Sequence, residues 1–150
     1  MIYHLDRSLF IPRPRADVFG FFAKTENLEE ITPAFLQFHI LTPQPIEMKA
    51  GTLIDYKLRL HGIPLRWRTR IEAFDPISSF TDSQLSGPYR RWVHRHDFTD
   101  APGGTNMRDR VDYELSFAPI GDLVHTLFVR RSVEQIFDHR NATILKLFAT

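Results

Sequence analysis

The spacing of apolar residues changes once along this chain, and the change limits the fold more than any other feature. Between residues 54 and 115, apolar and polar residues alternate in five runs separated by turn-forming residues. A period of two predicts strands that each have one buried and one exposed face. From Gly121 onward the apolar residues recur at steps of three and four, which predicts a helix running nearly to the end of the chain.

The residues before the alternating region predict shorter elements. Residues 3–11 alternate as a strand, Pro14 suits the first turn of a short helix, residues 27–31 predict a second helix, and residues 38–41 predict a short strand. A long helix with no partner helix of similar length needs a sheet to cover its apolar side. We therefore predict an α+β fold in one domain, residues 1–150, with a curved antiparallel sheet of about seven strands wrapped around the C-terminal helix.

Composition argues against several classes of protein. The chain has 19 basic and 18 acidic residues and no basic tail, so its charge gives no reason to expect a nucleic-acid partner. It has no cysteine and no apolar run of the roughly 18 residues that span a membrane. Its first residues lack the apolar core of a signal peptide, so we expect a cytoplasmic protein without a membrane span. Gly103 and Gly104 precede no helix, so we interpret them as a turn and not as a phosphate loop. No cofactor is predicted.

The strand register places polar residues on an otherwise apolar face. Pairing the hairpins without bulges puts Leu58 opposite Trp67, and it brings residues from three adjacent strands together on the inner side. Five polar residues share this side: Asp82, Gln84, His94, His96 and Asp109. Unpaired buried carboxylates are costly, so these groups should bond to each other, to water or to a ligand.

Four aromatic residues fall on the same predicted face: Tyr56, Trp67, Trp92 and Tyr113. Aromatic rings line either cores or ligand cavities. We predict that these rings line an internal cavity of at least roughly 300 Å³. The polar residues would then orient one end of an apolar ligand, which makes all nine residues candidates for ligand binding.

Other interpretations of the polar residues stay open. They can form a self-satisfied network, with Asp82 bonded to His94 and Asp109 to His96, or they can lie in water at an open end of the sheet. A His–Asp pair can also act as an acid and a base. The spacing His94-Arg95-His96 with one nearby carboxylate is compatible with a metal site, but it is weak evidence alone, and no metal is predicted.

The outer face of the sheet carries a row of arginines. Arg66, Arg68 and Arg70 alternate along one strand, and Arg90, Arg91 and Arg95 follow in the next part of the chain. Such a row could bind an acidic partner. A solvated sheet face is the more frequent role, and we favour it.

Several segments resemble a known superfamily. Pro14 with Val18-Phe19 opens the first helix, Asn27-Leu28 and Ile31-Thr32-Pro33 form the second, and a long helix closes the chain. This layout resembles, over the whole chain, the helix-grip superfamily of START domains, Bet v 1-type allergens and polyketide cyclase-like proteins. The segment from Asp82 to His96 looks like a bacterial subgroup without an assigned reaction.

The resemblance implies a deep cavity between the sheet and the long helix. Relatives bind lipids, sterols, polyketides or hormones, and a few catalyse cyclisation or dehydration. They share no common set of catalytic residues, so none can be transferred to this chain. Fold alone does not define function here.

We therefore expect a module that binds a small hydrophobic or amphipathic molecule. The competing hypothesis is an enzyme, a cyclase or dehydratase that uses His–Asp pairs in the same cavity. A third hypothesis is a protein-interaction domain that uses the arginine-rich outer face.

Overall fold

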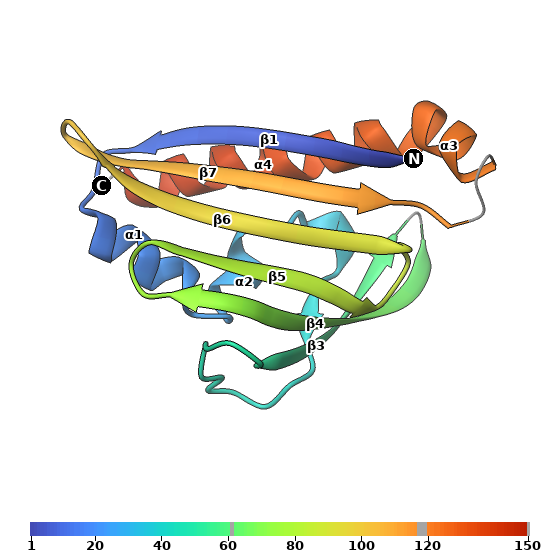
Figure 1. Cartoon of the computed structure of the whole chain (residues 1–150), viewed down its shortest axis with the longest axis horizontal. Coiled ribbons are helices and arrows are strands. Elements are labelled where there is room, and N and C mark those ends of the chain that lie inside the picture. Colours follow the sequence, from blue (N-terminus) through green and yellow to red (C-terminus); the bar gives the residue numbers. More distant parts are fainter. Residues whose placement is uncertain (61, 117–119, 150) are drawn as a thin grey trace.

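One antiparallel sheet of seven strands dominates the computed structural model, which describes residues 1–60, 62–116 and 120–149 (Figure 1). The strands lie in the order β1-β7-β6-β5-β4-β3-β2, so the first strand of the chain pairs with the last. Their bounds are β1 (Ile2–Ile11), β2 (His39–Ile40), β3 (Leu53–Leu60), β4 (Ile63–Asp75), β5 (Ser79–Ser86), β6 (Arg91–Ala101) and β7 (Gly104–Glu114).

Short helices follow the first strand, and a longer helical region closes the chain. The first group is α1 (Arg15–Phe22), α2 (Asn27–Ile31) and η1 (Ala34–Leu36); the second is α3 (Ile120–Val124), the π-helical turn η2 (His125–Val129) and α4 (Arg130–Phe148). Helix α4 contacts β1 and α2, while α1 contacts β6 and β7 (Figure 1). The helices therefore cover one face of the sheet, and the predicted α+β fold with a curved sheet and a long C-terminal helix is confirmed.

The predicted pairing of β3 with β4 is wrong by two residues. Trp67 pairs with Tyr56 rather than with Leu58, because β4 already begins at Ile63 and pairs there with Leu60. Gly62 has a φ of +79°, a backbone conformation that glycine adopts without strain in a tight turn. A shift of two residues keeps every side chain on its predicted face, since side chains alternate with a period of two.

A bulge changes the end of β4. The β4–β5 register shifts between Arg68 and Thr69 and again between Ile71 and Ala73. The second shift inserts one residue, so Ala73 is exposed and Phe74 packs against the core instead. The alternation of residues 65–73 predicts Ala73 on the same inner face as Ile71, and this prediction is wrong. The same alternation, continued across the turn, predicts that Ile71 pairs with Asp82, and this pairing is found.

The C-terminal helix differs from the continuous helix that the sequence predicts. The π-helical turn η2 interrupts it, and two residues of the predicted apolar stripe, Leu123 and Phe128, are each 60% exposed. The buried stripe of α4 is narrower and consists of Val133, Phe137, Arg140 and Ile144. Arg140 is the only charged residue among these four, and it lies within the site described below.

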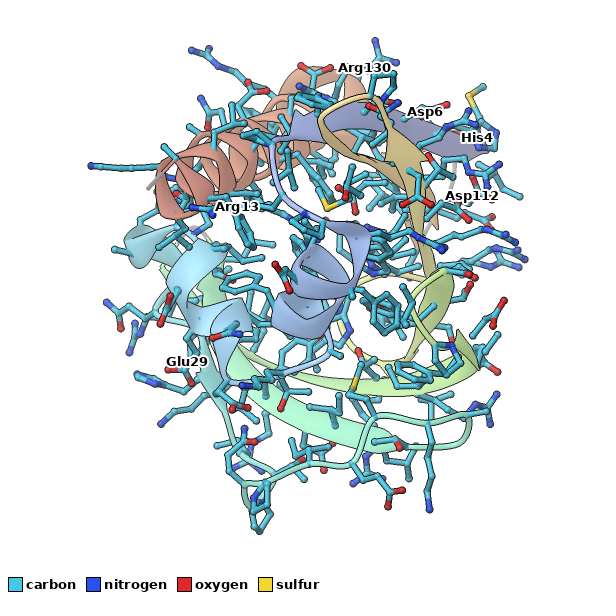
Figure 2. The ribbon with its side chains drawn as sticks, turned by 90° about the vertical axis from the view of Figure 1, so that its left-hand side faces the viewer. His4, Asp6, Arg13, Glu29, Asp112 and Arg130 are labelled. Carbon is cyan, nitrogen blue, oxygen red and sulfur yellow. The ribbon has the colours of Figure 1, made fainter. Side chains whose placement is uncertain are left out.

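Two apolar clusters form the core, one around Phe19 and Phe98 and one around Val111 and Phe137. Figure 2 shows His4 and Asp112 on the outer side of the sheet, where their side chains form an exposed pair. Arg13, also labelled in Figure 2, donates from Nε to the main-chain carbonyl of Phe148 at 3.2 Å. It thereby satisfies one carbonyl at the C-terminal end of α4.

None of the helices among the described residues has the combination of length and hydropathy needed to cross a bilayer.

Candidate functional site

A cavity of about 190 Å³ lies between the inner face of the sheet and the helices. Strands β3 to β6 and helices α1, α2 and α4 all contribute side chains to its walls, which are mostly aliphatic and aromatic. The cavity is smaller than the roughly 300 Å³ expected from the sequence, so that expectation of size is wrong. The rings of Trp67, Tyr89 and Trp92 pack together at one side and occupy part of the interior.

One wall carries ionisable side chains that we call the charged cluster: Asp82, His94, His96, Asp109 and Arg140. The strands place the first four in register, because Asp82 pairs with His94 across β5 and β6, and His96 pairs with Asp109 across β6 and β7. All except Asp109 line the cavity. The side chain of Asp82 is 17% exposed, whereas those of His94, His96 and Asp109 are 6%, 4% and 1% exposed.

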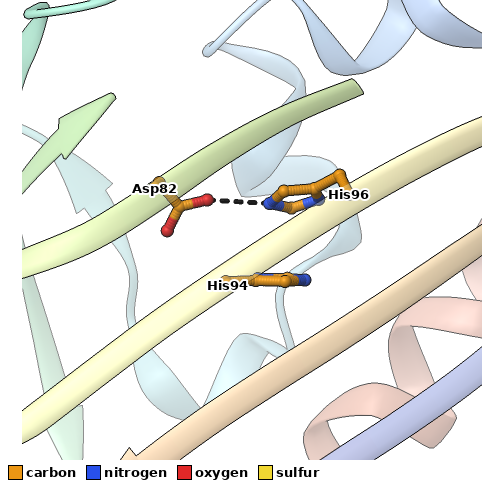
Figure 3. A group of neighbouring side chains, drawn as sticks. All are labelled: Asp82, His94 and His96. Carbon is orange, nitrogen blue, oxygen red and sulfur yellow. Dashed lines mark hydrogen bonds and ion pairs between the residues drawn. The ribbon is translucent and has the colours of Figure 1, made fainter. Parts of the chain in front are cut away.

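The side chains bond diagonally rather than straight across the strands. His96 Nε2 lies 2.7 Å from Asp82 Oδ2 (Figure 3). His94 Nε2 lies 2.8 Å from Asp109 Oδ1, and His96 Nδ1 lies 3.3 Å from the same oxygen. The alternative considered from the sequence paired Asp82 with His94 and Asp109 with His96. The hydrogen bonds instead join Asp82 to His96 and Asp109 to His94. Asp109 contacts both imidazoles.

Ring stacking holds the two imidazoles in place. The ring centroids of His94 and His96 are 3.6 Å apart, and Phe80 stacks on the other side of His96 at 4.0 Å. Phe137 of α4 meets His94 edge-on at 5.5 Å. The charged cluster is thus packed between β5, β6 and the C-terminal helix.

The two histidines have opposite pKa shifts. Burial and the neighbouring positive charge of His96 lower the pKa of His94 to about 4, although its hydrogen bond to Asp109 opposes this. Burial also opposes the charge on His96, but contacts with Asp109 and Asp82 outweigh it and raise the pKa of His96. At neutral pH, His94 is therefore neutral and donates its Nε2 proton to Asp109, whereas the contacts with two carboxylates favour the cationic form of His96.

Both carboxylates stay ionised. Burial raises the pKa of Asp82, but the hydrogen bond and charge of His96 outweigh it, so the net pKa shift is downward. The pKa of Asp109 is well below its usual value because Arg140 and the two histidines outweigh burial. When His96 is in this cationic form, two carboxylates are balanced by two cations, His96 and Arg140, and the charged cluster has no net charge.

Arg140 is the functional candidate that sequence reasoning missed. It is 8% exposed, its guanidinium lies 5.4 Å from the centre of the Phe22 ring, and its Nη2 is 3.5 Å from Asp109 Oδ1. The available signal was its helical spacing, since it follows Val133 and Phe137 at steps of four and three. A charged residue in an apolar stripe needs a buried partner, and Asp109 is that partner.

The aromatic wall lies on β3, β4 and β6. Trp67 packs on Tyr56 with ring centroids 5.9 Å apart and meets Trp92 edge-on at 5.4 Å. Tyr56 O–H and Thr69 Oγ1 are hydrogen-bonded at 2.8 Å. The indole N–H of Trp67 is buried without an acceptor among the described residues.

Three of the nine predicted site residues do not line the cavity. Gln84 instead closes the β5–β6 turn, where its amide donates to the carbonyl of Tyr89 and accepts from the Tyr89 N–H. Tyr113 bonds through its hydroxyl to His125 Nε2 at 2.7 Å, and Asp109 lies behind the histidines. The other six, Tyr56, Trp67, Asp82, Trp92, His94 and His96, line the cavity.

Asp82, His94 and His96 are also the residues that could hold a metal ion among those described. One ligand atom from each lies within 4.8 Å of the others. These atoms already bond within the charged cluster, with His96 directly on Asp82 and His94 on Asp109. A metal ion would have to replace the contact between His96 and Asp82. The contact between His94 and Asp109 could persist, because a carboxylate can accept a hydrogen bond from a metal-bound imidazole.

Comparison with known proteins gives the family. A family model described as "Polyketide cyclase / dehydrase and lipid transport" matches residues 11–138. The match covers most of the chain, so the chain belongs to this family, and the predicted superfamily is confirmed. A search among curated proteins finds no match.

Solved structures share the fold. The Zhui aromatase/cyclase of Streptomyces sp. R1128 is 15% identical, with a TM-score of 0.77, over 99% of this chain and 94% of that one. Ara h 8.0201 is 18% identical, with a TM-score of 0.64, over 97% and 99% of the two chains. A nucleoside-diphosphate sugar epimerase from Corynebacterium glutamicum is 26% identical, with a TM-score of 0.65, but its match covers 95% of this chain and 28% of that chain.

Proposed function

We propose that the chain binds a small hydrophobic or amphipathic molecule in the cavity between the sheet and α4. The observation that carries this proposal is the cavity itself, which has apolar and aromatic walls and a charged cluster on one side. Burial of apolar ligand surface supplies affinity, and a few fixed polar groups orient the ligand. The polar end of the ligand would lie at Asp82, His94 and His96.

Native mass spectrometry of the purified chain tests this proposal. We expect a copurified small molecule, released on unfolding, and a change in tryptophan fluorescence when it leaves, because Trp67 and Trp92 line the cavity. Leu58→Trp, which fills the cavity from β3, should abolish the adduct. Leu85→Trp is the matched control, since Leu85 is 45% exposed and does not line the cavity. An adduct that persists in Leu58→Trp, or a wild-type chain that binds no apolar molecule, would refute the proposal.

A second candidate function is a cyclase or dehydratase activity in the same cavity. The observation in its favour is the pair of differently charged imidazoles, because neutral His94 can accept a proton while cationic His96 can donate one. The low pKa of His94, about 4, makes it a weak base at neutral pH, which ranks this candidate second. Turnover of an aromatic or polyketide-like substrate that is lost in both His94→Phe and His96→Phe would favour it.

The outer arginine row gives no comparable support for a protein-interaction domain. Arg68 is paired with Asp55 and Arg70 with Glu72 on the exposed side of the sheet. Local acidic partners therefore already compensate these arginines, as is usual for a solvated sheet face.

A further inference from the structure

The size of the cavity limits its ligand. An engineered apolar cavity of about 150 Å³ holds one benzene molecule. At about 190 Å³, the cavity of this chain is about a quarter larger. It has room for one six-membered ring and a few attached atoms, whereas pockets for drug-sized ligands begin at about 300 Å³. Fused ring systems and long acyl chains exceed this volume, and they would have to extend into the neighbouring groove that shares Leu60, Tyr89, Val133 and Ile136 with the cavity.

The walls suit a flat, aromatic ligand. Trp67 and Trp92 both line the cavity, with ring centroids 5.4 Å apart and ring planes at 88° to each other. A bound aromatic ring could pack edge-to-face or offset against them, which aromatic pairs prefer to a face-to-face sandwich. Tyr56 continues the same wall through its stack on Trp67.

The charged cluster limits the charge of the ligand. Its two carboxylates and two cations are already balanced, so a charged ligand would be buried without a counter-ion, which is strongly unfavourable. A neutral hydroxyl group avoids this cost and can still donate a hydrogen bond. Asp82 is the most accessible member of the cluster on β5 and β6 at 17% exposure, and only its Oδ2 is hydrogen-bonded to His96. A carboxylate accepts several hydrogen bonds, so Asp82 can accept one more.

We propose that the cavity selects a neutral, single-ring aromatic alcohol, with the ring against Trp67 and Trp92 and the hydroxyl donating to Asp82. This inference rests on the proposed binding function and narrows it to phenol-like molecules. It distinguishes this chain from a carrier that encloses a long lipid within the cavity.

Calorimetric titration of the wild-type chain at neutral pH with four probes tests the inference. The probes are 4-methylphenol, toluene, 2-naphthol and decanoate, which separate the effects of the hydroxyl, the ring number and the charge. We expect 4-methylphenol to bind with a stoichiometry of one. Toluene should bind about tenfold or more weakly, because it lacks a hydrogen bond to a charged acceptor. Naphthol and decanoate should bind more weakly still.

A variant pair locates the hydroxyl contact. Asp82→Asn should lose most of the preference for 4-methylphenol over toluene, because a neutral amide accepts a weaker hydrogen bond than a carboxylate. Asp75→Asn is the matched control, since Asp75 is exposed at the end of β4 and does not line the cavity. The probe comparison on the wild-type chain needs no variant, so it decides the inference even if Asp82→Asn fails to fold.

The outcomes separate this inference from the function on which it rests. Tighter binding of 2-naphthol or decanoate than of 4-methylphenol overturns the single-ring inference and leaves the binding function standing. Equal affinity for toluene and 4-methylphenol overturns the hydroxyl contact. Failure of all four probes, in a chain that copurifies with another molecule, overturns only the inference. If the chain also lacks any copurified molecule, both proposals fail.

Discussion

The two faces of the sheet carry the same kind of ionic pair in opposite surroundings. On the outer face, Arg108 bonds to Asp6 through two nitrogens at 2.9 and 2.6 Å, and both side chains are about half exposed. On the inner face, His96 bonds to Asp82 at 2.7 Å, and the two side chains are 4% and 17% exposed. The distances are alike, so geometry alone does not distinguish the pairs.

Their environment does distinguish them. Water and salt screen the outer pair, and exposed pairs of this type contribute little to stability. The inner groups have left water, so each depends on the others, and their pKa values shift together. Ion pairs on the outer face are therefore replaceable, whereas those on the inner face form a unit that must be kept or replaced as a whole.

The largest effect that tests this difference is expected from Asp109→Asn. The substitution leaves His96 and Arg140 buried with fewer counter-charges, so the free energy of unfolding should fall by about 3–5 kcal/mol. Asp97→Asn is the matched control on β6, because Asp97 bonds to Arg95 and Arg110 on the outer face. It should change stability by at most about 1 kcal/mol. Urea unfolding measures both, and equal losses would show that the two faces do not differ.

The pH dependence of stability gives the next largest effect. The folded pKa of His94, about 4, lies below its unfolded value of about 6.5. Stability from this group is therefore fully present above pH about 6.5 and is lost as the pH falls toward 4, because the unfolded chain takes up the proton first. A shift of this size corresponds to about 3 kcal/mol.

The other members of the charged cluster act in different pH ranges. The raised pKa of His96 gives stability that is lost as the pH rises above about 6.5. The lowered pKa values of Asp82 and Asp109 give stability that is lost below about pH 4. His94→Phe should therefore flatten the loss between pH 6.5 and 4, as measured by urea unfolding at several pH values. An unchanged slope in the variant would contradict the assignment to His94.

Sequence reasoning predicted the layers of this fold because periodicity reports directly on burial. The polar side chains lie on the predicted side of their strands: Asp82, His94, His96 and Asp109. A register error of two residues leaves this side unchanged, because side chains alternate with a period of two. Sequence reasoning failed at Ala73, where one inserted residue reverses the faces, at Leu123 just before the π-helical turn, and at Phe128 within that turn. Such local irregularities depend on contacts between distant segments that no short pattern contains.

The candidate site was predictable only in part. Strand parity brought Asp82 and the two histidines together, but it could not give their diagonal bonding, which depends on side-chain torsions. Arg140 comes from a helix about thirty residues away from Asp109 along the chain, and no register relates α4 to the sheet. The volume of the cavity was also inaccessible, because it depends on how the rings of Trp67 and Trp92 pack.

A smaller effect is expected where an inner-face pair is neutral. Tyr113 and His125 are both buried and bond at 2.7 Å, but no full charge is involved. Tyr113→Phe should lower the free energy of unfolding by about 1–2 kcal/mol, the cost of losing one hydrogen bond and leaving a buried partner unpaired. Tyr89→Phe, on the aromatic wall, is the control and should cost less than about 0.5 kcal/mol. A loss from Tyr113→Phe as large as that from Asp109→Asn would mean that burial rather than charge sets the cost.

The smallest effect is expected from added zinc. Asp82, His94 and His96 are close enough for a metal, but His96 already bonds to Asp82, and balanced charges reduce the attraction for a cation. At about 100 μM zinc, the stability of the wild-type chain should rise by less than about 0.5 kcal/mol, which corresponds to weak binding. The measurement is a thermal or urea transition with and without zinc, with His94→Phe as the comparison. A large stabilisation of the wild-type chain that disappears in His94→Phe would identify a metal site instead, because Asp82 is one of the three potential ligands and would then be bound to the metal rather than to a ligand hydroxyl.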